Sequence, residues 1–249
     1  MSVDLAGRVV VVTGGTKGLG RGIAEAFRGA GAHVLVCARN APEAPVDHFV
    51  SADLRDPEAA NSVVTAAVDT WGRLDVVVNN AGGAPPAPAA EASPNFVSKV
   101  IGLNLLAPLY VAQAAYPVMA AQPDGGVIIN IGSLSGHRPS PGSSAYGAAK
   151  AGLANLTATL AMEWAPQVRV NEVMVGYLET EQSGLFFGDE AGIARVAKTV
   201  PMQRLAQPAD VAAACLYLSS PEAAFVTGAT IAIHGGGEPP PFLSAVTHD

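Results

Sequence analysis

The chain has 249 residues, with 14 lysines and arginines against 21 aspartates and glutamates, which gives a formal net charge of −7 and a sequence pI of about 5.2. An acidic chain is a poor partner for nucleic acid, because duplex binding needs a basic surface that displaces counterions. Charged residues make up only 14% of the chain, against roughly 25% in an average soluble domain. We therefore expect part of the surface to be covered in a homo-oligomer, either a dimer or a tetramer.

The first residues and the cysteines indicate the compartment. Residues 1–5 contain no basic segment, and the first apolar run is short, so we expect no signal peptide. No stretch approaches the roughly 18 consecutive apolar residues of a membrane helix. Cys37 and Cys215 are far apart and have no metal-ligand spacing, which is typical of reduced thiols. These features predict a cytoplasmic protein with no membrane span and no metal site.

Short β-branched runs alternate with longer alanine-rich windows, which is the pattern of a parallel sheet covered by helices on both faces. We expect seven strands, at residues 8–13, 33–38, 47–52, 74–79, 126–133, 168–174 and 230–234. We expect helices at residues 18–29, 57–71, 95–121 (in one or two pieces), 144–164, 191–200 and 208–219. Pro42 and Pro45 leave no room for a helix between the second and third strands. The pattern predicts one doubly wound α/β domain over residues 1–249, with a tail at residues 235–249.

A glycine-rich turn, TGGTKGLG at residues 13–20, follows the first expected strand and leads directly into a helix. At such a junction, small residues let backbone N–H groups approach the pyrophosphate of a dinucleotide. The residues that we expect to contact a dinucleotide here are Gly14, Thr16, Lys17, Gly18, Leu19 and Gly20.

Four further segments follow in order. NNAG at residues 79–82 ends the fourth strand, and Asn104 lies in GLNLLAP at residues 102–108. Ser133 ends the fifth strand, and YGAAK at residues 146–150 begins the long helix. Together with the TGxxxGxG turn, these segments resemble the short-chain dehydrogenase/reductase family over residues 8–237. The resemblance implies a Rossmann-like fold, a nicotinamide cofactor, and a catalytic set of Asn104, Ser133, Tyr146 and Lys150.

The residue types of this set suit proton transfer to a carbonyl group. Tyr146 and Lys150 are four residues apart on a helix, so their side chains share one face, with Cβ atoms roughly 5 to 6 Å apart. A nearby ammonium favours the phenolate, so we expect it to lower the pKa of Tyr146 and make this residue a general acid or base. Ser133, at the carboxyl end of a strand, can donate a hydrogen bond to a substrate carbonyl oxygen. By resemblance, Asn104 orders a proton-relay water.

The end of the second strand indicates which cofactor is bound. An acidic residue there would bind the ribose 2′-hydroxyl of NAD, but Ala38 stands at this position and Arg39 follows it. Lys17 adds a second cation, so a 2′-phosphate would find two partners. We therefore expect NADP(H), with NAD as the alternative.

The resemblance places the remaining cofactor contacts along the later segments. After the sixth strand, NEVMVGYLET at residues 171–180 is similar to the family segment that holds the nicotinamide carboxamide, although Val175 replaces the usual proline. The contacts that the resemblance implies are Asp53, Leu54, Asn80, Ala81, Gly82, Tyr146, Lys150, Val175, Gly176, Leu178 and Thr180.

These features predict an NADP(H)-dependent oxidoreductase that interconverts a secondary alcohol and a ketone, such as a steroid-like alcohol or a 3-oxoacyl thioester. One alternative is a reductase of 3-oxoacyl groups on acyl carrier protein. No lysine or arginine lies between Pro108 and Gly126, so that surface is poor for docking an acidic carrier. A second alternative is a regulatory nucleotide-binding protein without turnover, which would not require Ser133.

The C-terminal tail carries three prolines, Pro239 to Pro241, followed by Phe242 and Leu243. Prolines stiffen a segment, and the two apolar side chains favour burial. The tail therefore either packs on a neighbouring subunit or forms a frayed terminus.

Overall fold

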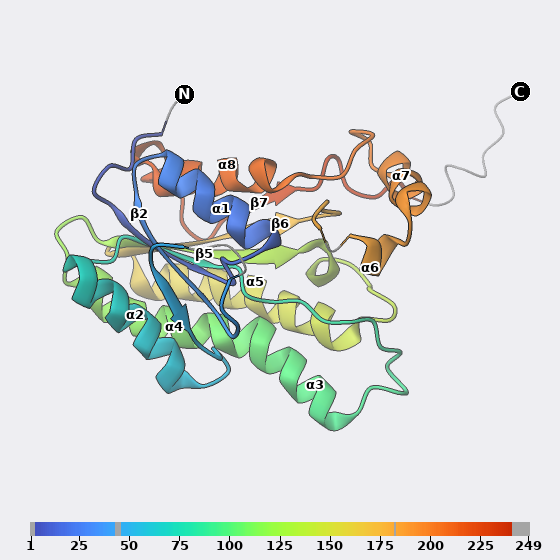
Figure 1. Ribbon diagram of the computed structural model, residues 1–249, viewed down its shortest axis with the longest axis horizontal. Coiled ribbons are helices and arrows are strands. Elements are labelled where there is room, and N and C mark those ends of the chain that lie inside the picture. The colour runs from blue at the N-terminus through green and yellow to red at the C-terminus, as the bar shows by residue number, and fades with distance from the viewer. Residues whose placement is uncertain (1–2, 43–45, 182, 241–249) are drawn as a thin grey trace, which may run out of the picture.

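In the computed structural model, a seven-stranded parallel sheet forms the centre of the molecule (Figure 1). The structure describes residues 3–42, 46–181 and 183–240. The strands are β1 (Val9–Thr13), β2 (His33–Ala38), β3 (Phe49–Ser51), β4 (Val76–Asn79), β5 (Gly126–Ser133), β6 (Val168–Val175) and β7 (Thr230–Ile233). Their order across the sheet is β3-β2-β1-β4-β5-β6-β7, so the winding direction reverses between β1 and β4. The expected doubly wound, Rossmann-like fold is confirmed.

Helices cover both faces of this sheet (Figure 1). One face packs against α1 (Gly18–Gly29) and α8 (Pro208–Ser219). The other face packs against α2 (Pro57–Trp71), α4 (Ala107–Ala120) and α5 (Ser144–Trp164). The strands β1 and β4 consist almost wholly of valine because helices bury both of their sides.

Three elements differ from the sequence expectation. The strand β3 keeps three residues, because only these pair with the end of β2 at the sheet edge. The expected helix at residues 95–121 divides into α3 (Pro94–Ile101), a π-helical turn (Gly102–Leu106) and α4. A short helix α6 (Gly184–Phe187), too short to show a periodic pattern, precedes α7 (Glu190–Thr199). In the described parts of residues 39–48, no helix joins β2 to β3, as the prolines predict.

One helical stretch is long and apolar enough to cross a membrane by length and composition alone. It runs through α3, the π-helical turn and α4, from Pro94 to Ala120, with a mean hydropathy of 1.3. The stretch is not an uninterrupted apolar run, because Lys99, Asn104 and Gln113 lie within it. In this fold the α4 part covers the sheet, with Val111 and Met119 fully buried.

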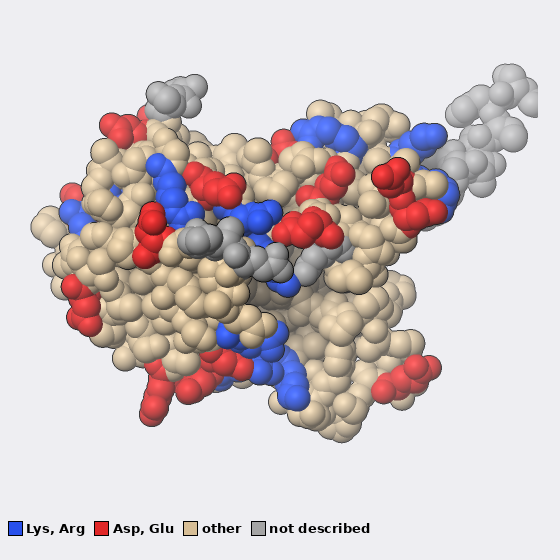
Figure 2. All heavy atoms as spheres, viewed as in Figure 1, with Lys and Arg blue, Asp and Glu red and all other residues tan. Residues whose placement is uncertain are grey.

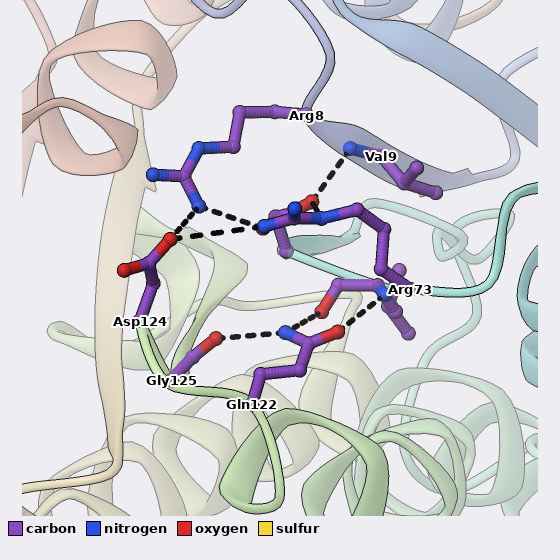
Figure 3. Close-up of polar contacts among 8 residues, drawn as sticks. Arg8, Val9, Arg73, Gln122, Asp124 and Gly125 are labelled. Carbon is purple, nitrogen blue, oxygen red and sulfur yellow. Dashed lines mark hydrogen bonds and ion pairs between the residues drawn. The ribbon is translucent and has the colours of Figure 1, made fainter.

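The amino-terminal edge of the sheet is held by a polar network (Figure 3). The buried Asp75 accepts hydrogen bonds from Arg73 Nε at 2.8 Å, from Arg8 Nη1 at 2.9 Å and from the Val9 amide at 2.8 Å. Burial alone would raise the pKa of Asp75, but these hydrogen bonds outweigh it, so its pKa lies below the usual value. Gln122 closes the same edge by bonding the backbone of residues 74 and 125. The arginines of this network are paired with Asp75 and Asp124. The candidate active site lies at the other ends of the strands, their carboxyl ends.

Candidate active site

The carboxyl ends of β1 to β4 open into a pocket of about 320 Å³. Figure 2 shows a hollow near the middle of this face, with basic side chains on its flanks. The predicted cofactor contacts that line the pocket are Gly14, Thr16, Lys17, Gly18, Leu19, Gly20, Arg39, Asp53, Leu54, Asn80, Ala81, Gly82 and Thr180. The pocket is also lined by Cys37, Ala38, Ala52 and Leu103, which were not predicted as contacts.

The glycines of the first turn give this pocket the shape that a dinucleotide requires. Gly14 has φ +64° and Gly18 has φ +53°, a region that other residues rarely adopt. A Cβ atom on Gly20 would lie 2.2 Å from the carbonyl oxygen of Gly14, so only glycine lets the helix approach the turn. The result is a bare backbone cradle at the N-terminus of α1, which fits the phosphates of a dinucleotide.

Asn80 joins the glycine-rich turn to the end of β4. Its Nδ2 donates to the carbonyl oxygens of Thr13 at 2.9 Å and Gly14 at 3.2 Å. In return, the Thr13 hydroxyl accepts from the amides of Asn80 and Ala81, both at 2.9 Å. The Asn80 side chain is therefore engaged in building the wall of the pocket.

The outer end of the pocket is basic. Lys17 and Arg39 are exposed there, and Ala38 leaves no acidic side chain at the end of β2. Asp53 is held by Arg55, whose Nε donates to Asp53 Oδ1 at 2.9 Å while its Nη2 bonds the other carboxylate oxygen. The Arg55 hydrogen bonds lower the pKa of Asp53 to about 2. Sequence reasoning missed Arg55, although its spacing of two residues from Asp53 was visible.

Sequence reasoning also missed Glu181, which follows Thr180 in the loop after β6. Its Oε1 accepts a hydrogen bond from the Gly18 amide at 2.9 Å and lies 3.6 Å from Arg21 Nη2. Hydrogen bonds from its own amide and from Gly18 lower the pKa of Glu181. A carboxylate therefore stands at the N-terminus of α1, the end of the helix that attracts anions. No local sequence signal links residues 18 and 181.

The structure brings together Ser133, Tyr146 and Lys150 beside the pocket. The Ser133 side chain lies near the Tyr146 phenol and acts to lower the pKa of Tyr146. Lys150, almost completely buried, donates from Nζ to the Ile131 carbonyl oxygen at 2.7 Å and lies 5.7 Å from the centre of the Tyr146 ring. Burial lowers the pKa of Lys150 to about 8.

The protonation of Tyr146 differs from the sequence argument, which expected the lysine to lower its pKa. In this structure, burial of the phenol raises the pKa of Tyr146, and the Ser133 side chain only partly opposes it. Residue spacing gave the shared helix face but not the burial, because the covering loops come from distant parts of the chain. The phenol is therefore protonated at neutral pH in the absence of a bound dinucleotide.

Asn104 lies in the π-helical turn and is fully buried. Its Oδ1 accepts from the Gly83 amide at 2.8 Å, and its Nδ2 donates to the carbonyl oxygens of Gly83 at 3.1 Å and Val100 at 2.9 Å. A Cβ atom on Gly82 would lie 2.7 Å from Asn104 Oδ1 and 3.5 Å from Lys150 Nζ. Asn104 therefore lies close to Lys150, but its side chain is engaged by the loop after β4.

Five predicted contacts do not line the pocket: Tyr146 and Lys150, which lie beside it, and three residues at the end of β6 and after it. Val175 is buried against the α1 and α8 face, the Gly176 amide bonds the Ile233 carbonyl oxygen at 3.0 Å, and Leu178 forms a bridge with Ala206. Phe242 and Leu243 of the tail lie outside the described residues.

Comparison with known proteins places the whole chain in one family. The family model described as enoyl-(acyl carrier protein) reductase matches residues 14–238. An uncharacterized oxidoreductase of Mycobacterium tuberculosis is 37% identical over 240 residues, covering 92% of this chain and 91% of that protein. The 3beta-hydroxysteroid dehydrogenase 1 of Eggerthella lenta is 34% identical over 246 residues, covering 94% of each protein.

A solved structure agrees with this placement. The ligand-free aldohexose dehydrogenase of Thermoplasma acidophilum has a TM-score of 0.90 at 29% identity and covers 100% of this chain and 98% of its own. The fold, the glycine cradle and these relatives lead to one assignment. The chain belongs to the short-chain dehydrogenase/reductase family, whose members are oxidoreductases that use a nicotinamide cofactor.

Proposed function

We propose that the protein is an NADP(H)-dependent oxidoreductase that interconverts a secondary alcohol and a ketone with a largely apolar body. The observation that carries the reaction is the contact between Ser133 and Tyr146 beside the dinucleotide-shaped pocket, with the Lys150 ammonium beneath the phenol ring. A bound nicotinamide supplies the hydride in reduction or accepts it in oxidation. The side chains around it position the substrate and move the proton.

Tyr146 is the proton donor for the carbonyl oxygen during reduction. Its raised pKa keeps the phenol protonated at neutral pH, which suits this role. Ser133 donates a hydrogen bond to the same carbonyl oxygen and so polarises the carbonyl group. Lys150 fixes the phenol from below, and Asn104 holds the loop that forms the wall beside Lys150.

The cofactor preference rests on charge at the outer end of the pocket. Lys17 and Arg39 are exposed at the pocket and would bind a 2′-phosphate there, while Arg55 neutralises the nearby carboxylate of Asp53. A phosphate of charge about −1.5 to −2 gains from each cation, whereas a neutral ribose gains little. NADP(H) is therefore favoured over NAD(H).

The preference for an apolar substrate rests on the surroundings of Tyr146. A small hollow beside it is lined by Ala84, Pro85, Ala87 and Phe96 from the segment after β4. On helix α6, which follows β6, Leu185 and Phe186 are 76% and 56% exposed. An apolar ketone would bury these surfaces, at a gain of about 25 cal/mol for each Å² removed from water.

A screen for cofactor oxidation tests this proposal. Steroid-like ketones, aldoses, 3-oxoacyl-CoA esters and 3-oxoacyl-acyl carrier protein are each mixed with the protein and either NADPH or NADH. We expect the highest kcat/KM with an apolar ketone and NADPH. Preference for the carrier-bound thioester would instead establish the acyl carrier protein reductase, and absence of turnover with every class would contradict the proposal.

The same proposal includes a homo-oligomer in the cytoplasm. Met162, Met202 and Phe225 are large apolar side chains that remain exposed in the single chain, which suits surfaces that are covered on association. Light scattering of the purified protein tests the assembly, and a monomer at micromolar concentration would contradict it. Fluorescent tagging in the source cell tests the compartment.

A further inference from the structure

A carboxylate lies fully buried under helix α5, although none of the steps above uses it. Glu172 on β6 has no exposed surface, and its Oε2 accepts a hydrogen bond from the Thr230 hydroxyl of β7 at 2.7 Å. His137 approaches from the loop after β5, with Nε2 at 3.4 Å from the same oxygen. Burying a charge is costly unless it is balanced, so a carboxylate in this place calls for a nearby cation.

The neighbouring strand leaves space for this carboxylate. Gly132 stands on β5 immediately before Ser133, and a Cβ atom on Gly132 would lie 1.9 Å from Glu172 Oε1. Any other residue at position 132 would therefore displace the carboxylate. The chain thus combines a glycine and a buried acid next to the serine that lies near the Tyr146 phenol.

Besides His137, Lys150 lies close enough to this arrangement for the charge of Glu172 to act on it. Its Nζ donates to the carbonyl oxygen of Ile131, the residue bonded directly to Gly132. The ammonium and the Glu172 carboxylate therefore flank a single peptide unit, and standard backbone dimensions place them within roughly 9 Å of each other. Among the described residues, the other buried acid is Asp75, which belongs to the arginine network at the opposite edge of the sheet.

We propose that Glu172 is a positioning residue that acts through Lys150, because its buried negative charge balances the ammonium and keeps it in place beneath Tyr146. The inference rests on the role proposed above for Lys150. The groups that face the pair are Tyr146 from α5, Ser133 from β5, Thr230 from β7, His137 from the loop after β5, and Asn104 from the π-helical turn.

The balance of forces on Lys150 agrees with this role. Burial lowers the pKa of Lys150, and the charge of Glu172 acts in the opposite direction. Without the carboxylate, burial would act with less opposition, and the ammonium would lose its proton at lower pH. A neutral Lys150 would no longer present a positive charge beside the Tyr146 ring.

The test follows Lys150 directly in the cofactor-free protein, so it does not depend on turnover. The chain has four lysines, Lys17, Lys99, Lys150 and Lys198, so a lysine-labelled sample gives few side-chain NMR signals, and K150R identifies that of Lys150. In E172Q we expect the titration midpoint of this signal to move about one pH unit lower, from a charge removed at roughly 9 Å. E172D, which restores the carboxylate, should return the midpoint toward its original value.

A matched control tests whether the loss of any carboxylate from the protein, rather than the loss of the buried one near Lys150, moves the midpoint. Glu163 lies on α5 as well, but its side chain is exposed, so E163Q should leave the midpoint unchanged. A folded E172Q whose Lys150 midpoint moves no more than that of E163Q would overturn the inference.

A second measurement needs no variant at position 172. The chemical shift of the side-chain carboxyl carbon of Glu172 should change at the pH of the Lys150 midpoint, and this change should be absent in K150M. Absence of that change in the original protein would overturn the inference equally, whereas failure of the ketone screen would leave both results intact.

Discussion

The carboxylate of Glu181 accepts a hydrogen bond from the Gly18 amide at 2.9 Å, at the helix end to which the phosphates of a dinucleotide are attracted. The loop after β6 thus supplies its own anion to the cradle. Because two anions would compete for this helix end, we expect the charge of Glu181 to weaken cofactor binding. E181Q removes that charge and keeps an acceptor, so we expect the Kd for NADPH to fall about threefold to tenfold, as for loss of a partly screened repulsion.

Calorimetric titration measures this effect. Glu25 is the matched control, since it also lies near Arg21, at 4.0 Å, but one turn further along α1. E25Q should change the Kd by less than about twofold, as expected for an exposed pair. Equal Kd values for NADPH in E181Q and the original protein would contradict this prediction, because they would mean that the charge of Glu181 does not oppose cofactor binding.

The basic end of the pocket predicts a change of cofactor preference. Replacing Lys17 and Arg39 together by alanine removes two partners of a 2′-phosphate, each worth roughly tenfold in binding. We expect the Kd for NADPH to rise about 100-fold and that for NADH to change by less than about threefold. Parallel losses for the two cofactors would show that these residues serve the fold rather than the phosphate.

Tyr146→Phe tests the proton donor. The ring and its packing remain, so NADPH should bind as before, whereas kcat for ketone reduction should fall about 10² to 10⁴-fold because the acid is gone. Steady-state kinetics and calorimetry on one preparation give the two quantities. A variant that keeps its turnover would remove Tyr146 from the mechanism.

The network around Asp75 predicts how stability depends on pH. The pKa of Asp75 is lower in the folded protein than in the unfolded chain, so the unfolded state binds more protons between those two values. Its stabilising contribution is therefore present above the unfolded pKa of about 4 and is lost as the pH falls through the folded pKa.

D75N leaves Arg73 and Arg8 without their carboxylate, and we expect the free energy of unfolding at neutral pH to fall by roughly 2 to 3 kcal/mol. Its stability should also change less than that of the original protein as the pH is lowered below about 4. Urea denaturation at several pH values measures both effects. D124N, at an exposed position beside the same arginines, should cost less than about 1 kcal/mol.

The strands and the dinucleotide pocket could be predicted because their signals are local. Strands such as β1 and β4 are buried on both sides and therefore read as valine runs, and the glycine spacing at residues 14–20 follows from the backbone shape of one turn. Tyr146 and Lys150 share a helix face for the same local reason.

What the sequence did not reveal depends on residues far apart in the chain. Glu181 meets Gly18 across more than half of the sequence, and Glu172 is recognisable as a buried acid only once β5, β7 and α5 surround it. The raised pKa of Tyr146 has the same origin, because burial by distant loops outweighs the favourable spacing to Lys150. The short β3 reflects its place at the sheet edge, where only three residues find partners.

The central claim is that hydride passes between a nicotinamide and a carbonyl carbon while Tyr146 supplies the proton. Mass spectrometry tests it most directly, with NADPH deuterated at nicotinamide C4 and the best ketone from the screen. The account predicts one deuterium on the carbinol carbon of the alcohol product, formed by the original protein and almost absent with Tyr146→Phe. An alcohol without deuterium from NADPH labelled on either face of C4, or equal labelled product from Tyr146→Phe, would contradict it.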